Sequence, residues 1–133
     1  MPSAARNAFS PDTMRLGRNQ AMVASRSVFQ EVASSGWSQL IQNDINGLIT
    51  AEVLVCNKTS SDGWFSLAVV TTSQVAGGLT DYSDFVIYHQ CELLAGETFV
   101  VPLLLNLNPD QILAAKASDA DRINAWVNYC QDQ

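Results

Sequence analysis

The chain has little charge and little of what catalysis requires. Charged residues make up 15% of its 133 residues, whereas about 25% is usual in soluble globular chains. It has one histidine, His89, and it contains no GxSxG, HExxH or phosphate-loop motif. Because catalysis needs a nucleophile, a base or a metal held in mutual reach, we expect no enzyme, no cofactor and no metal. The low charge favours a permanent partner that covers part of the surface.

Paired cysteines and long apolar runs are also missing. Cys56, Cys91 and Cys130 are odd in number and far apart, which argues against a closed disulfide framework and against a CxxC metal knuckle. Each falls in a strand-like run, so buried thiols are expected. No apolar run reaches the ~18 residues of a membrane span, and no signal-peptide region is evident. We therefore expect a soluble, reduced protein with no membrane partner.

Positive charge is scarce and unevenly placed. Thirteen acids against seven bases give a net charge of -6, which speaks against direct binding of nucleic acid. A basic arm nevertheless precedes an acidic body, because residues 1–30 hold four arginines and one acid. This pattern is either chance or an arm that docks on an acidic surface of a partner. The four arginines are Arg6, Arg15, Arg18 and Arg26.

What the sequence does have is alternation of apolar and polar residues. In residues 48–70 two such runs flank the polar segment NKTSSDG, which predicts a hairpin that turns at Asp62 and Gly63. A lone hairpin is not stable in water, so the rest of the chain must supply a second layer. A short strand is expected at 37–42, and further strands are expected at 85–93 and 99–107.

Several details of these segments carry further expectations. His89 has the same parity as most apolar residues in 85–93, which means that its odd number places it on their face of the strand. This position favours a core histidine over a ligand. Pro102 cannot donate to a ladder, so its strand lies at an edge or has a bulge there. Residues 72–83 are rich in glycine and small polar residues and are expected to form a loop that contacts partners. Residues 20–32 fit a strand about as well as a poor helix, and the strand is favoured.

The last third allows two interpretations. Asn108, Pro109 and Asp110 could start a helix, but residues 123–129 alternate cleanly. Strands are favoured, which brings the count to about eight. The prediction is an all-β, antiparallel β-sandwich, jelly-roll-like, with residues 1–36 as an extended N-terminal arm and lead-in strand and 37–133 as the sandwich domain.

Four short motifs follow one another in the chain: Val55-Cys56-Asn57-Lys58, Ala95-Gly96-Glu97-Thr98, the strand from Asp110 to Ser118, and the alternating strand from Ile123 to Tyr129. Their order resembles a small β-sandwich domain of tailed-bacteriophage virion proteins. The resemblance covers about residues 37–129, and residues 1–36 have no counterpart in it. It implies a structural virion protein, either a capsid decoration (cement) protein that binds the major capsid protein or a neck, tail or fibre component. A homo-oligomer is expected, with a trimer favoured.

Two tryptophans are candidate contact residues. Trp64 and Trp126 fall on the parity opposite the predicted core rows, and outward aromatic residues are frequent at protein contacts. They could equally be covered by the arm of the same chain, or stack on sugar rings in a carbohydrate-binding module. The acidic pairs in residues 81–84 and 119–121 supply too few oxygens for calcium and are interpreted as solvated turns.

Overall fold

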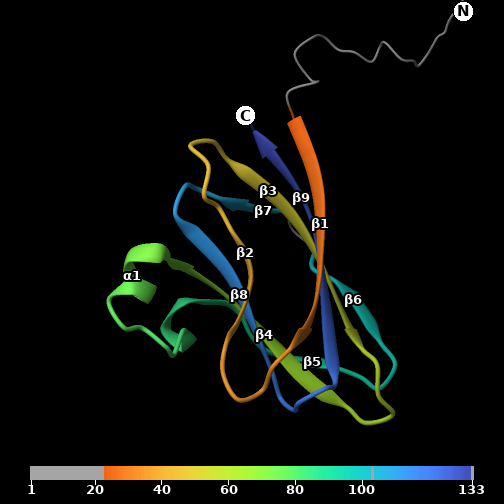
Figure 1. Ribbon diagram of the computed structural model, residues 1–133. Coiled ribbons are helices and arrows are strands. Elements are labelled where there is room, and N and C mark those ends of the chain that lie inside the picture. Colours follow the sequence, from red (N-terminus) through yellow and green to blue (C-terminus); the bar gives the residue numbers. More distant parts are fainter. Residues whose placement is uncertain (1–22, 103, 133) are drawn as a thin grey trace, which may run out of the picture.

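The protein is built from two antiparallel sheets packed face to face (Figure 1), as seen in a computed structural model that describes residues 23–102 and 104–132. Sheet A has the strand order β1-β9-β3-β6, with β7 also paired to β3, and sheet B has the order β2-β8-β4-β5. The predicted all-β sandwich is therefore confirmed. The strands are β1 (Val23–Val32), β2 (Ser38–Gln42), β3 (Ile49–Asn57), β4 (Gly63–Thr71), β5 (Val86–Leu93), β6 (Thr98–Val100), β7 (Leu105–Leu107), β8 (Gln111–Ala117) and β9 (Ile123–Asp132); the helices are α1 (Thr72–Ala76) and the 3-10 turn η2 (Ser83–Phe85).

The topology is that of a jelly roll. β6 and β7 pair with successive parts of β3, so together they occupy one strand position and the sandwich has eight positions. The single strand expected at 99–107 is divided in two around Pro102, and the predicted edge position of this segment is confirmed. Most connections cross from one sheet to the other, since consecutive strands such as β1 and β2 belong to different sheets.

The predicted hairpin at residues 48–70 is wrong. β3 pairs with β9 in sheet A, and β4 pairs with β8 and β5 in sheet B. The connecting segment is an arch across the core instead of a turn within one sheet. Buried Asn57 explains the crossing, because its amide donates to the carbonyls of Ser61 (2.8 Å) and Leu93 (3.0 Å) at the point where the chain leaves sheet A.

Alternation of side chains builds the shared core as expected. In β3, β4 and β9 every second residue points between the sheets, and most of these residues are fully buried. The C-terminal third forms β8 and β9, so the strand interpretation is confirmed and the helix is excluded for these residues. Core residues of this kind include Ile49, Val53, Phe65, Leu67, Ile123 and Val127.

His89 is exposed, so the expected core histidine is wrong. β5 is irregular where it pairs with β4, with register shifts between Phe65 and Leu67 and between Leu67 and Ala68. Gln90 has a positive φ of 46°, which is typical of a bulge. One extra residue reverses which parity faces the core, so Cys91 and Tyr88 both pack inward while His89 points out.

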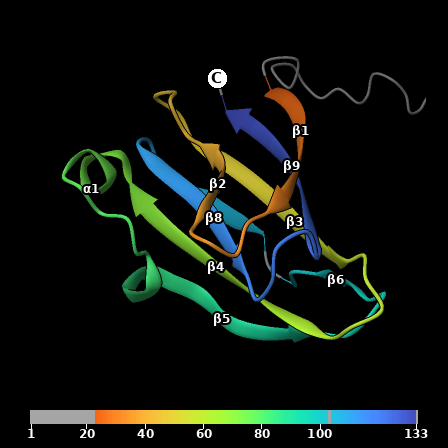
Figure 2. The same ribbon diagram turned by 60° about the horizontal axis from the view of Figure 1, so that its bottom comes forward.

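The predicted loop at residues 72–83 contains helix α1 and is followed by η2. Thr71 caps the helix, since its hydroxyl accepts from the Gln74 amide while the Gln74 side chain accepts from the Thr71 amide. This segment lies against sheet B and away from sheet A (Figure 2). It makes a second apolar cluster with the outer face of that sheet, formed by Ala68, Val70, Tyr82, Ile112 and Ala114 with Trp37, Val75, Leu79, Phe85 and Val86.

Candidate functional site

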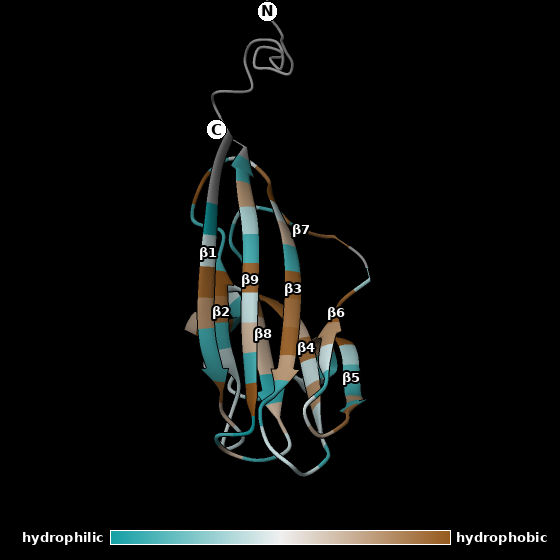
Figure 3. Cartoon of the chain, turned by 90° about the vertical axis from the view of Figure 1, so that its right-hand side faces the viewer, coloured by the Kyte–Doolittle hydropathy of each residue, from teal (hydrophilic) through white to brown (hydrophobic). Residues whose placement is uncertain are grey.

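The outer face of sheet A carries a continuous row of apolar side chains. Phe29 of β1 is paired with Trp126 of β9, Trp126 is paired with Leu54 of β3, and Leu54 is paired with Val100 of β6. All four lie on the parity opposite the core residues of their strands. We call these four residues, one from each strand, the apolar row. Figure 3 looks onto this face, with β1 at one side followed by β9 and β3.

The apolar row is exposed to an unusual degree for large side chains. Phe29 is 60% exposed, Trp126 46% and Val100 50%, while Leu54 is half-buried. The rings of Phe29 and Trp126 meet edge to face, with centroids 5.8 Å apart and planes at 88°, a favourable aromatic geometry. The row is therefore an ordered patch whose area stays in contact with water in the isolated chain.

Polar groups border the apolar row and fix its aromatic residues. Asn128 Oδ1 accepts from Trp126 Nε1 (2.7 Å) and from Ser27 Oγ (2.7 Å). Beyond Asn128 the face is hollowed, with a volume of about 500 Å³. Arg26, Glu52 and Leu104 are among the residues lining the hollow. An apolar centre with a polar border is typical of a protein contact surface.

The two sheets differ in how their outer faces are covered. The outer face of sheet B is packed under α1 and η2, whereas the apolar row on sheet A has no such cover among the described residues. Trp64 is half-buried and shares the outward parity of Ser66 and Ala68 on sheet B. The predicted pair of tryptophans therefore lies on opposite faces of the sandwich, and only Trp126 belongs to the apolar row.

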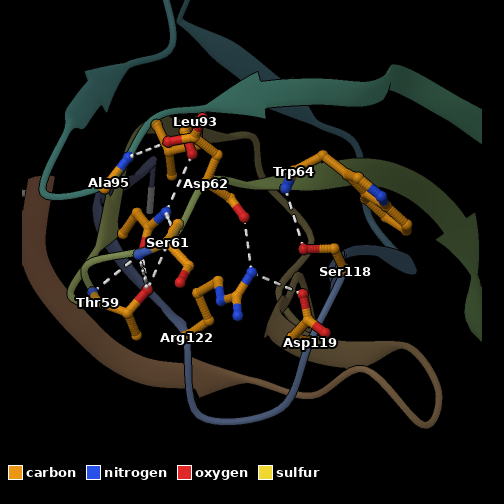
Figure 4. Close-up of polar contacts among 10 residues, drawn as sticks. Thr59, Ser61, Asp62, Trp64, Leu93, Ala95, Ser118, Asp119 and Arg122 are labelled. Carbon is orange, nitrogen blue, oxygen red and sulfur yellow. Dashed lines mark hydrogen bonds and ion pairs between the residues drawn. The ribbon is translucent and has the colours of Figure 1, made fainter.

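One end of the sandwich is held by a polar network (Figure 4). Arg122 donates to the carbonyl oxygen of Asp62 (2.6 Å) and pairs with the carboxylate of Asp119 (2.8 Å). The Asp62 carboxylate accepts from the Ala95 amide (2.9 Å), and Ser118 Oγ accepts from the Trp64 amide (3.1 Å). These bonds join three of the connections between the sheets, so the network is a structural device that keeps this end closed.

Two carboxyl groups have a lowered pKa, and each takes part in a structural contact. The Lys58 ammonium bonded to Glu31 is the main reason the pKa of that carboxyl is lowered. The pKa of Asp81 is lowered chiefly because Ser83 donates to it through Oγ (2.6 Å) and its backbone amide (3.1 Å). These are turn and ion-pair roles. In the described ranges, no group of three or more His, Cys, Asp or Glu side chains could hold a metal.

The cysteines differ from the expected buried thiols. Cys56 and Cys91 are half-buried, and Cys130 is exposed on β9. Desolvation raises the pKa of Cys91, as expected for a thiol packed against the core. The expectation of burial is thus wrong for Cys130, because its parity places it with Trp126 and Asn128 on the outer face.

Of the predicted contact residues, the structure places three. Arg26 lies on β1, is exposed and lines the hollow beside the apolar row, and Trp64 and Trp126 lie as given above. Arg6, Arg15 and Arg18 fall outside the described residues. Sequence reasoning did not assign Phe29, Leu54 and Val100 to a contact surface, because their neighbourhood depends on pairing between strands distant in the chain. No helix in the described ranges is long and apolar enough to cross a membrane.

Comparison with known proteins finds a solved structure of similar fold but no matching family. Neither a family model nor a curated protein matches the chain. One solved structure with a similar fold comes from Bacillus endospore appendages, described as "a novel family of disulfide-linked pili". The match has a TM-score of 0.52 and 11% sequence identity, and it covers 84% of this chain and 88% of the other. At this identity the likeness concerns the sandwich fold alone.

Proposed function

We propose that the chain is a structural, non-catalytic protein of a tailed-bacteriophage virion, and specifically a decoration protein that attaches to the major capsid protein. The observation that carries the proposal is the apolar row on sheet A, exposed beside a hollow while the other sheet is covered. A monomer gains nothing from such an ordered patch in water, whereas a protein partner would bury it.

The charge distribution supports the same role. Residues 1–22 carry three arginines and one acid, against a net charge of -6 for the whole chain. In the proposal this basic segment binds acidic patches of the shell while the sandwich lies on it as a rigid body. A part that binds only the assembled shell stabilises it by mass action. The fold shared with a chain from endospore pili is compatible with a structural role.

The test is occupancy on purified phage particles that carry the protein. Val100→Lys puts a charge into the apolar row and is expected to lower occupancy at least tenfold. The matched control is Ile87→Lys, because Ile87 is 42% exposed on sheet B and should leave occupancy unchanged. Deleting residues 1 to 20 should also abolish decoration and leave a folded sandwich. Equal occupancy for all variants would rule out both the surface and the arm.

Copy number distinguishes capsid decoration from a neck, tail or fibre position within the virion. A decoration protein is present in hundreds of copies in each particle, whereas a neck, tail or fibre component is present in few. Protein stoichiometry on a stained gel of purified particles distinguishes these two versions of the proposal. Absence of the chain from particles would remove both.

A carbohydrate-binding module is the second candidate. The observation in its favour is the exposed ring of Trp126 near the hollow on sheet A. Against it, Trp64 lies on the opposite face, so the two tryptophans form no common platform for sugar rings. Fluorescence of Trp126 across a glycan panel separates this candidate from the structural one.

A further inference from the structure

The free edge of β1 differs from the other edges of the described sheets. β2 is five residues long with a register shift between Gln39 and Ile41. β5 has two register shifts and a positive φ at Gln90. The edge formed by β6 and β7 consists of two three-residue strands separated at Pro102. Short strands, bulges, prolines and charged side chains are features by which proteins protect sheet edges from further pairing.

β1 is neither short nor interrupted by a bulge or a proline, and it carries only two charged residues. It spans ten residues, contains no proline, and pairs with β9 from Val23 to Val32 without a register shift. Its only charged residues are Arg26 and Glu31. Of the described strands, only β9 pairs with it, so its other side offers backbone amides and carbonyls for an added strand.

The side-chain pattern of β1 fits pairing with a second copy of itself. In such a pair the two β1 strands are antiparallel and are related by a two-fold axis perpendicular to the sheet. The core-facing side chains of both copies lie on the same side of the joined sheet only if the two residues of each cross-strand pair are both odd-numbered or both even-numbered. A register centred on Phe29 meets this condition. It puts Phe29 opposite the same residue of the second copy, Glu31 opposite Ser27, and Val28 opposite Gln30.

This register is favourable in detail. A cross-strand aromatic pair stabilises a sheet, and like charges do not face each other, because Arg26 comes opposite Val32. The apolar row ends at Phe29 on β1. In the paired form it continues into the apolar row of the second copy, so the outer face becomes one continuous apolar band over eight strands.

We propose that two copies of this chain associate by antiparallel pairing of their β1 strands in the register centred on Phe29. The result is a closed two-fold dimer, in place of the trimer favoured from the sequence, and in it the long β1 edges cover each other. The proposal concerns contacts between copies and stands independently of what the outer face of sheet A binds.

Site-directed cross-linking tests the register. In the full chain with Cys56, Cys91 and Cys130 replaced by alanine, Phe29→Cys should give a disulfide-linked dimer under mild oxidation by copper phenanthroline. Directly opposed residues have Cα atoms about 4.5–5.5 Å apart, within reach of a disulfide. Ser27→Cys is the control, because the two copies of position 27 would lie four residues apart, about 13 Å along the strand. A mixture of Ser27→Cys and Glu31→Cys chains should cross-link. Equal cross-linking at positions 27 and 29 would overturn the register.

The mass of the unmodified full chain tests the association itself. Light scattering should give the mass of a dimer at micromolar concentration; a monomer or a three-fold assembly would overturn the proposal. Phe29→Lys should raise the dissociation constant of the dimer about tenfold or more, since it replaces the aromatic pair by two positive charges that face each other. Val100→Lys makes the same change at the far edge of sheet A and should leave the dimer intact. Loss of decoration without loss of the dimer in Val100→Lys separates this proposal from the proposed function.

Discussion

Two buried asparagines perform the same task at different connections between the sheets. The Asn43 amide donates to the carbonyls of Gly47 (3.0 Å) and Leu107 (2.8 Å), and its Oδ1 accepts from the Ile45 amide (3.1 Å). Asn57 repeats this pattern, because its Oδ1 accepts from the Thr59 amide (3.0 Å) while its amide serves two carbonyls. Each side chain satisfies backbone groups that the arch would otherwise bury unpaired.

Replacing Asn57 by alanine should therefore destabilise the fold strongly. The variant leaves the carbonyl of Leu93 buried without its donor and removes the bond that orders the arch, for a loss of about 3 kcal/mol in the free energy of unfolding. Urea denaturation measures the change. Asn46→Ala is the control, since Asn46 is exposed and its replacement should cost less than about 0.5 kcal/mol. Equal losses for the two variants would contradict this role of Asn57.

Among the elements, the segment with α1 and η2 has the clearest structural task, which is to cover the outer face of sheet B. Tyr82 anchors it, with 5% of its surface exposed and its ring stacked on Trp37 at a centroid distance of 5.6 Å. Tyr82→Ala should lower the free energy of unfolding by about 3 kcal/mol, because a large buried ring is lost. Tyr82→Phe keeps the stack and should cost about 1 kcal/mol or less. Thermal unfolding of the two variants measures the difference, and a Tyr82→Ala loss as small as that of Tyr82→Phe would disprove the anchor.

The elements also show how far the sequence could predict this fold. Parity is local, so the core residues of β3 and β9 and the outward position of Trp126 followed from alternation alone. Pairing is not local. The arch after Asn57 and a hairpin turn have the same composition, and the choice depends on the distant carbonyl of Leu93.

The same limit explains the misplaced residues. The position of His89 depends on a bulge that changes parity within one strand. The apolar row depends on contacts between β1, β9, β3 and β6, which lie far apart in the chain. The fold class was therefore predictable, but the candidate surface required the register.

At the scale of the whole molecule, salt should act in opposite directions on the two proposed contacts. Each copy carries a net charge of -6, so two copies repel each other as their β1 strands approach, and counterions screen this repulsion. The dissociation constant of the dimer should therefore fall when ionic strength rises from about 0.05 M to 0.5 M. Attachment of the basic N-terminal segment to acidic patches of the shell should weaken over the same range.

Sedimentation equilibrium of the free chain and retention on pelleted particles measure these two trends separately. A dimer that dissociates with added salt would mean that opposite charges, and not the paired edges and Phe29, hold the copies together. Decoration that is indifferent to salt would assign attachment to the apolar row alone, because burial of uncharged surface is not screened by ions. The sign of each salt dependence therefore identifies which part of the chain makes which contact.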